Sequence, residues 1–128
     1  MGFPIWPKPC STDPKVMLKH NLQIGQVGEE IAKEYLEKKG FKILERNYKT
    51  KYGETDIIAK CGKELVFVEV RTKIGENFGT PEDSLNKRKL RKLWLNARAG
   101  KATRIDAVCI VLNNNLTVER LNHYENIL

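Results

Sequence analysis

The chain has 128 residues, of which 41% are hydrophobic and 30% charged, and its formal net charge is +7. These values predict one globular domain with a single core and exclude a disordered chain. No apolar stretch approaches the roughly 20 residues that a membrane-spanning helix needs, so we expect no membrane partner. The positive charge favours a polyanionic partner, most simply nucleic acid, although many basic proteins owe their charge to solubility alone.

The cysteines and the N-terminal segment bear on compartment and boundaries. Cys10, Cys61 and Cys109 are odd in number and lack CxxC spacing, so neither a disulfide framework nor a zinc site is expected, and a cytoplasmic location fits best. Residues 1–20 hold four of the five prolines and no apolar signal-peptide core. They are predicted to form an irregular arm ahead of one domain at 21–128.

The remaining elements follow in chain order. Apolar residues from Ile24 to Tyr35 recur at spacings of three and four and predict a helix over 21–39. Three strands are expected in FKILERNY, ETDIIAKC and ELVFVEVRTK. A Gly-rich loop then leads into a helix over 81–100, and RIDAVCIVL and LTVERL predict a buried strand and an edge strand. The order α-β-β-β-α-β-β indicates an α/β fold, a mixed central sheet flanked by helices.

The strand ELVFVEVRTK carries charges on one face of its second half. Glu69, Arg71 and Lys73 alternate and therefore point to the same side. Asp56 lies on the preceding strand, which should pair antiparallel and bring it close to Glu69. Acids inside a sheet are costly unless they are paired or bind a cation, and oxygen ligands suit Mg²⁺ or Mn²⁺. The alternative is a structural salt bridge from Glu69 to Arg71 or to a helix lysine.

The first helix supplies a third acid. Glu29 falls at the edge of its apolar stripe and is predicted to reach the rim of the sheet, whereas Glu30 falls nearly opposite and should face water. A solvated helix acid is the alternative for Glu29. Three small residues on the same side would let the helix approach the sheet closely: Gly25, Gly28 and Ala32.

The second helix is predicted to bury an apolar stripe of Leu90, Leu93, Trp94 and Ala97. Lys89 flanks this stripe. The more outward basic residues are Arg88, Arg91 and Lys92. Such a basic face is either solvated or in contact with phosphates, which provide affinity independent of sequence.

These segments together resemble the UPF0102 family, also called the YraN-like family, of predicted endonucleases. The resemblance covers about residue 22 to the C-terminus, through GQVGEEIAKEYLEKKGFKILERNY, GETDIIA, LVFVEVRTK, FGTPEDSLNKRK and RIDAV in that order. The family is similar to archaeal Holliday-junction resolvases and belongs to the PD-(D/E)xK, or restriction-endonuclease-like, superfamily. The resemblance implies an α-β-β-β-α-β core, a metal-dependent endonuclease acting on DNA, including branched or junction DNA, and a homodimer.

The resemblance also implies roles for single residues. Asp56, Glu69 and the carbonyl of Val70 would bind Mg²⁺ or Mn²⁺, and Glu29 would bind a second ion or a metal-bound water. The superfamily lysine falls on Arg71, and Lys73 stands where the family usually has arginine. The family's FG-x-P segment with its following lysine falls on Phe78, Gly79, Pro81 and Lys89.

The substitution at position 71 separates the functional hypotheses. Arginine stays protonated and cannot act as a general base, but it can stabilise a charged transition state. The leading hypothesis is phosphodiester hydrolysis, with Arg71 and Lys73 at the scissile phosphate and Lys89 with the outward basic residues on the backbone. The alternative is a catalytically weak or inactive nucleic-acid-binding module on a nuclease fold. A third is a protein-interaction domain whose acids form salt bridges.

Overall fold

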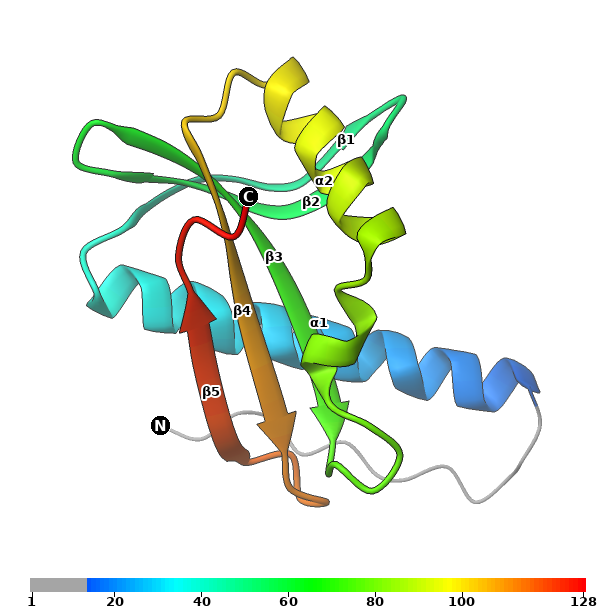
Figure 1. The fold of residues 1–128 in the computed structure, drawn as a ribbon. Coiled ribbons are helices and arrows are strands. Elements are labelled where there is room, and N and C mark those ends of the chain that lie inside the picture. The colour runs from blue at the N-terminus through cyan, green and yellow to red at the C-terminus, as the bar shows by residue number, and fades with distance from the viewer. Residues whose placement is uncertain (1–13) are drawn as a thin grey trace.

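The structure is a computed structural model that describes residues 14–128, with side chains from His20 onward. A five-stranded sheet lies between two helices (Figure 1). The fold class and the order of the elements are as the sequence predicts. The elements are α1 (Pro14–Lys38), β1 (Lys42–Thr50), β2 (Gly53–Cys61), β3 (Glu64–Ile74), the 3₁₀ helix η1 (Pro81–Ser84), α2 (Lys87–Ala99), β4 (Arg104–Leu112) and β5 (Val118–Tyr124).

Two element boundaries differ from the prediction. Helix α1 begins at Pro14, so residues 14–20 are helical rather than part of an irregular arm, and residues 1–13 lie outside the described chain. The prediction started the helix at the first clear apolar repeat, but proline is compatible with the first turn of a helix. The last strand begins at Val118 because Leu116 adopts a positive φ of 62° and is buried in the core.

The sheet is mixed, as expected, and its strand order is β1-β2-β3-β4-β5. Strands β3 and β4 pair in parallel, and the other neighbours pair antiparallel. Helix α2 lies in the β3–β4 connection, which is the crossover that parallel neighbours require. In Figure 1, β3 turns away to run beside β4, whereas β1 and β2 continue across the top of the sheet.

The two faces of β3 pack against different helices. Val66, Val68 and Val70 join the larger apolar cluster, which includes the buried side chains of α1. Phe67 belongs to a second cluster with Ala97 of α2. The predicted alternation along β3 is confirmed, and it places Glu69 and Arg71 on the α2 side of the sheet.

The segment predicted as one helix over 81–100 divides into η1 and α2. Asn86 has an extended backbone and accepts a hydrogen bond from the Lys89 amide, so it caps a new helix. The predicted stripe is wrong for Trp94, which is 43% exposed. Asn96 is buried in its place because its amide donates to Thr55 Oγ1 at 2.6 Å and its carbonyl accepts from the Thr50 hydroxyl.

The glycines of α1 have different surroundings. A Cβ built on Gly28 would overlap the Thr72 side chain on β3, whereas a Cβ on Gly25 meets no atom of the described residues within 4 Å. Gly28 therefore sets how closely α1 approaches β3. Gly25 lies where the helix and the sheet leave open space.

We predict opposite effects when each of these glycines is replaced by alanine. Gly28→Ala should lower the free energy of unfolding by about 1–3 kcal/mol, because an overpacked contact forces the helix away from the sheet. Gly25→Ala should raise it by up to about 1 kcal/mol, because alanine is the better helix former. Chemical denaturation of both variants checks this, and stabilisation by Gly28→Ala would contradict the close approach.

Candidate functional site

A pocket lies where β2 separates from β3. The paired register of these strands ends at Ile57 and Val68, so Asp56 and Glu69 would form the next pair. Instead, the Asp56 side chain accepts a hydrogen bond from the Val70 amide, with a distance of 2.8 Å between N and Oδ2. Beyond this point the β2-facing edge of β3 is open.

The pocket has a volume of about 380 Å³ and is lined from four directions: α1, the end of β2, the open half of β3, and the segment η1–α2. Val70, proposed from the resemblance as a carbonyl ligand, is part of the lining. The lining residues are Asn21, Gly25, Glu29, Glu54, Asp56, Glu69, Val70, Arg71, Thr72, Lys73, Pro81, Ser84 and Lys89.

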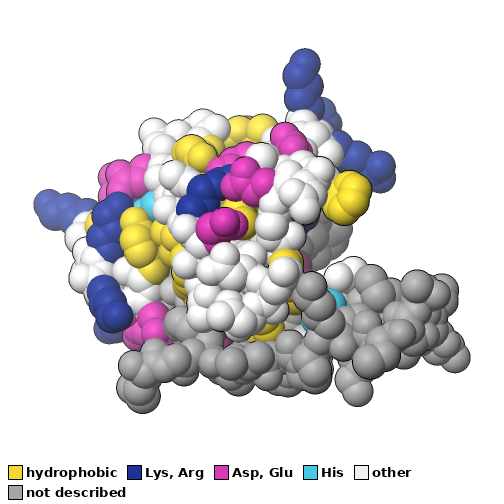
Figure 2. All heavy atoms as spheres, turned by 90° about the horizontal axis from the view of Figure 1, so that it is seen from below, with side chains coloured by type: hydrophobic (Ala, Val, Ile, Leu, Met, Phe, Trp, Pro, Cys, Tyr) yellow, Lys and Arg dark blue, Asp and Glu magenta, His cyan; other side chains and the backbone are white. Residues whose placement is uncertain are grey.

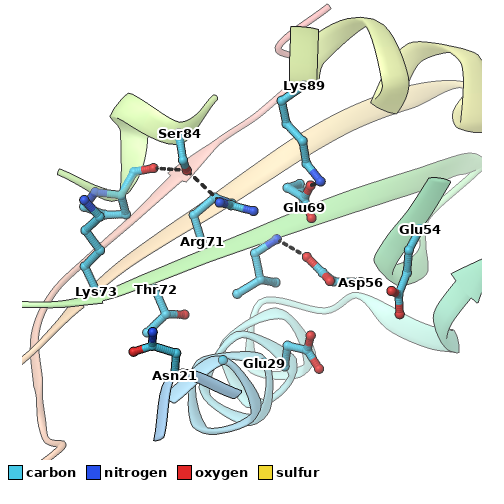
Figure 3. A pocket seen from close by; sticks show the side chains of 13 residues that line it. Asn21, Glu29, Glu54, Asp56, Glu69, Arg71, Thr72, Lys73, Ser84 and Lys89 are labelled. Atoms are coloured by element: carbon cyan, nitrogen blue, oxygen red, sulfur yellow. Dashed lines mark hydrogen bonds and ion pairs between the residues drawn. The ribbon is translucent and has the colours of Figure 1, made fainter. Parts of the chain in front are cut away.

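Carboxylates from three elements share the pocket. Figure 3 shows the side chains of Glu29, Glu54 and Asp56 turned toward the same space. Glu69 is 2% exposed, and burial, followed by the neighbouring Asp56, raises its pKa to about 8. Burial and then Asp56 likewise raise the pKa of Glu29 to about 7. Both shifts arise because negative charge here is poorly solvated and repelled by a neighbour.

Helix α1 is rotated as the sequence predicts. The Glu29 side chain is 20% exposed and lines the pocket, whereas the Glu30 side chain is 48% exposed. Arg46 of β1 lies between them, with Nη1 2.5 Å from Glu30 Oε1 and Nη2 4.0 Å from Glu29 Oε2. Arg46 therefore neutralises Glu30 more closely than Glu29.

Lys89 forms the helix–lysine salt bridge that was the alternative interpretation of Glu69. Its Nζ lies 2.9 Å from Glu69 Oε2, although this oxygen has no hydrogen bond of proper geometry within the described residues. The ammonium lowers the pKa of Glu69, but burial and Asp56 raise it more. One lysine therefore does not compensate the acids of this pocket.

Arg71 is held by η1. Its Nε donates to Ser84 Oγ at 2.6 Å, and the Ser84 hydroxyl donates to the Pro81 carbonyl at 2.7 Å. This contact uses Nε and leaves the two terminal guanidinium nitrogens for another acceptor. Ser84 thus orients a cation at the pocket wall.

Lys73 occupies a different part of the pocket. Its Nζ lies beside Gly79, 3.5 Å from the point where a Cβ would stand. Figure 3 shows its side chain on the far side of Ser84 from the acids. Lys73 shares a face with Arg71, as predicted, but it lies two residues farther along β3, roughly 7 Å.

Phe78 and the outward basic residues predicted on α2 do not line the pocket. Arg88, Arg91 and Lys92 are exposed on α2, so their outward orientation is confirmed and their contact with nucleic acid stays a prediction. Phe78 is 97% exposed, whereas Pro81 of the same segment is buried.

The donor set of the pocket fits a hard divalent cation. It offers carboxylate oxygens, which Mg²⁺ and Mn²⁺ prefer, and Glu69 Oε2 is a buried oxygen to which no described residue donates a well-formed hydrogen bond. Within residues 14–128, no three acidic, His or Cys side chains stand in a ready-made ligand arrangement. The ligand set is therefore incomplete as it stands, with the Lys89 ammonium beside Glu69.

Four lining residues were not predicted from the sequence: Asn21, Glu54, Thr72 and Ser84. Glu54 stands two residues before Asp56, so strand alternation could have found it. Asn21 precedes Gly25 and Glu29 at spacings of four on one side of α1, a pattern that also could have been recognised. Ser84 had no signal, because its role depends on the fold of η1 against β3.

Comparisons with known proteins place this chain among similar sequences. The model of the uncharacterised protein family UPF0102 matches residues 28–110. A UPF0102 protein of Caldanaerobacter subterraneus subsp. tengcongensis is 42% identical over 112 residues, covering 80% of this chain and 92% of the relative. A UPF0102 protein of Pelotomaculum thermopropionicum is 40% identical over 111 residues, covering 80% and 92%. One of Carboxydothermus hydrogenoformans is 40% identical over 114 residues, covering 83% and 95%.

We predict that Glu69→Gln flattens the pH dependence of stability in the metal-free protein. The folded-state pKa of Glu69 is about 8 against an ordinary 4.5, so the folded protein binds more protons than the unfolded chain between these values. Wild-type stability should therefore fall as the pH rises through this window. Glutamine does not ionise, so the variant lacks this loss. Its free energy of unfolding relative to wild type should therefore rise by on the order of 2 kcal/mol between the lower and the higher of these pH values.

Chemical denaturation across this pH range measures the effect. Glu34→Gln is the matched control, because Glu34 is exposed on the same helix that carries Glu29. A Glu69→Gln variant that loses stability with pH as steeply as wild type would contradict the assigned burial of charge at this position.

Proposed function

The chain belongs to the uncharacterised protein family UPF0102, and from its pocket we propose that it is a metal-dependent endonuclease that hydrolyses phosphodiester bonds in DNA. One observation carries the proposal. Glu29, Asp56 and Glu69 come from three separate elements to one pocket, and burial and mutual repulsion raise the pKa values of two of them. A structural Lys89–Glu69 salt bridge does not by itself account for Glu29 and Asp56 at the same pocket.

Asp56, Glu69 and the Val70 carbonyl would hold Mg²⁺ or Mn²⁺. Such an ion supplies Lewis acidity, which offsets phosphate charge and makes water more acidic. Asp56 is already oriented for this role by the Val70 amide, which holds one carboxylate oxygen at 2.8 Å. The second oxygen is left for another partner.

Glu29 suits a proton-accepting role. Its pKa of about 7 lies near neutral pH, where a carboxylate is most effective as a general base. The side chain lines the pocket from α1 and is not fully buried, so water reaches it. Glu29 would accept the proton of the attacking water, in place of the base that Arg71 cannot be.

Arg71 would bind the scissile phosphate. Ser84 fixes the side chain through Nε, and the terminal nitrogens donate to phosphate oxygens as charge accumulates on them. Lys89, at the same pocket, would contact the phosphate backbone, whereas Lys73 lies beside Gly79, two residues farther along β3 than Arg71.

The basic surface supports DNA as the substrate. The net charge is +7, and Arg88, Arg91 and Lys92 are exposed on the helix that carries Lys89. Branched or junction DNA and a homodimer rest on the resemblance to resolvases alone. A cytoplasmic location is part of the proposal and agrees with the free thiols of Cys61 and Cys109. Among the described helices, none has the length and apolar character that crossing a membrane requires.

A binding module without catalysis is the second candidate. It is favoured by Arg71 in the lysine position and by the Lys89–Glu69 ion pair, which places an ammonium where a metal would be needed. This candidate predicts DNA binding without metal-dependent cleavage.

We predict metal-dependent cleavage that requires the acids. Incubation of plasmid and four-way-junction DNA with wild-type protein and Mn²⁺ or Mg²⁺ should give nicks, and Asp56→Ala or Glu69→Gln should reduce the rate at least about 100-fold. DNA binding should persist, since neither change removes a basic residue. Arg71→Lys should retain or raise activity, and Lys73→Ala should reduce it less than Arg71→Ala.

Glu34→Gln serves as the control for charge removal at an exposed site. Gel assays of the products and anisotropy of labelled DNA separate cleavage from binding. Tight DNA binding by wild type with no cleavage in either metal would favour the binding module and refute the nuclease.

A further inference from the structure

Trp94 lies on the surface of α2 although its neighbours predict burial. We propose that the surface around Trp94 and Tyr52 binds unpaired DNA bases by stacking, and thereby selects substrates with a single-stranded segment beside the pocket. The inference rests on the proposed function for its choice of DNA. The aromatic surface itself is a separate part of the molecule.

The open side of the Trp94 indole borders a hollow of its own. This hollow measures about 370 Å³ and is lined by Lys87, Leu90, Arg91, Trp94 and Leu128. Arg98 stacks on the indole with its guanidinium carbon 5.1 Å from the ring, but Arg98 does not line this hollow. Trp94 thus has a cation over its ring and also borders a hollow that Arg98 does not line.

Tyr52 provides a second aromatic surface nearby. It is 36% exposed and lines another hollow, of about 430 Å³, together with Trp94 and Arg98. Lys51 lies 5.2 Å from the Tyr52 ring, so this ring also has a cation beside it. Aromatic side chains interleaved with cations are typical of surfaces on which successive bases of a single strand stack.

The charge of α2 identifies the occupant as an anion. Its 13 residues include six Lys or Arg and no Asp or Glu. Lys87, Arg88 and Lys89 occupy the first turn, where the helix dipole disfavours cations. Only Lys89 of these three has an acidic partner among the described residues.

Other parts of the surface differ from α2. On the face seen from below, acidic and basic side chains lie next to one another (Figure 2). Basic side chains on that face therefore have acidic neighbours, which α2 itself does not provide. An apolar protein segment on α2 would have to bury Lys87, Arg91 and Arg98 without acids, whereas a polynucleotide brings a phosphate for each base.

The position of Trp94 connects this surface to the pocket. Lys89 points to Glu69 inside the pocket, and Trp94 lies five residues later on the same helix. Five residues advance a helix by about 7.5 Å and turn it by about 140°, so Trp94 faces a different side of α2 from Lys89. A strand whose bases stack on Trp94 would therefore pass around α2 to bring a phosphate to the pocket.

Binding assays with EDTA test the proposal without any cleavage. Fluorescence anisotropy would compare wild type, Trp94→Ala and Trp94→Phe on a fluorescein-labelled single-stranded oligonucleotide and on its blunt duplex. Trp94→Ala should weaken single-strand binding on the order of tenfold and duplex binding less than about twofold, because duplex bases are already stacked. Trp94→Phe keeps an aromatic face and should recover most of the affinity.

Val118→Ala is the matched control, because Val118 is exposed to a similar extent, 41%, at the start of β5. Circular dichroism verifies the fold, and size-exclusion chromatography follows self-association. Single-strand affinity that is unchanged in Trp94→Ala, or equal losses on both DNA forms, would overturn the proposal. A dimer that dissociates in Trp94→Ala without loss of single-strand affinity would also overturn it and make this surface a subunit contact.

Failure of the nuclease proposal can be distinguished from failure of the stacking proposal. If wild type binds single strands through Trp94 but cleaves no DNA with Mn²⁺, the stacking surface stands and the catalytic assignment falls.

Discussion

The Val70 amide donates to the Asp56 carboxylate at the point where the β2–β3 ladder stops. In a continuous sheet this amide would serve the strand ladder, and Asp56 and Glu69 would lie side by side between two paired strands. The hydrogen bond to the Asp56 side chain replaces a backbone hydrogen bond between β2 and β3. Strand β2 can therefore separate from β3 while it stays paired with β1. The open edge of β3 that results is a wall of the pocket, so this partly buried hydrogen bond marks where the pocket forms.

The same separation explains the electrostatics of the pocket. Glu69 is on a buried strand and cannot turn to water, and Gly28 lets α1 pack closely enough on β3 to bring Glu29 to the same space. Burial and Asp56 then raise the pKa values of both glutamates. Lys89 relieves part of this repulsion through an ion pair. A divalent cation would reduce the repulsion between the acids further. The acids that cost stability in the metal-free protein are therefore the same ones that are candidates for the catalytic centre.

Much of this arrangement is predictable from local patterns. Alternation along β3 puts Glu69 and Arg71 on one face, and helical rotation separates Glu29 from Glu30, because both depend only on the geometry of a single element. Antiparallel pairing of β2 and β3 then brings Asp56 near Glu69. These three inferences need no knowledge of how distant segments pack.

The features that the sequence did not predict depend on polar contacts, most of them between distant segments. Asn96 is buried instead of Trp94 because Thr50 and Thr55 on the β1–β2 hairpin satisfy its amide. The helix predicted over 81–100 breaks at Asn86, where a capping bond competes with continuation. Ser84 orients Arg71 only because η1 folds over β3. In each case a polar partner far along the chain, or a local cap, outweighs the apolar pattern.

Calorimetric titration of the metal-free protein with Mn²⁺, in buffers of different ionisation enthalpy near neutral pH, tests most directly whether the acids form a cation site. Metal ligands must be deprotonated, so binding to glutamates with raised pKa values should release protons. We expect saturable binding with proton release in wild type and no binding in Glu69→Gln. Absence of Mn²⁺ binding by the wild-type protein, or binding that Glu69→Gln leaves unchanged, would contradict a cation site at these acids.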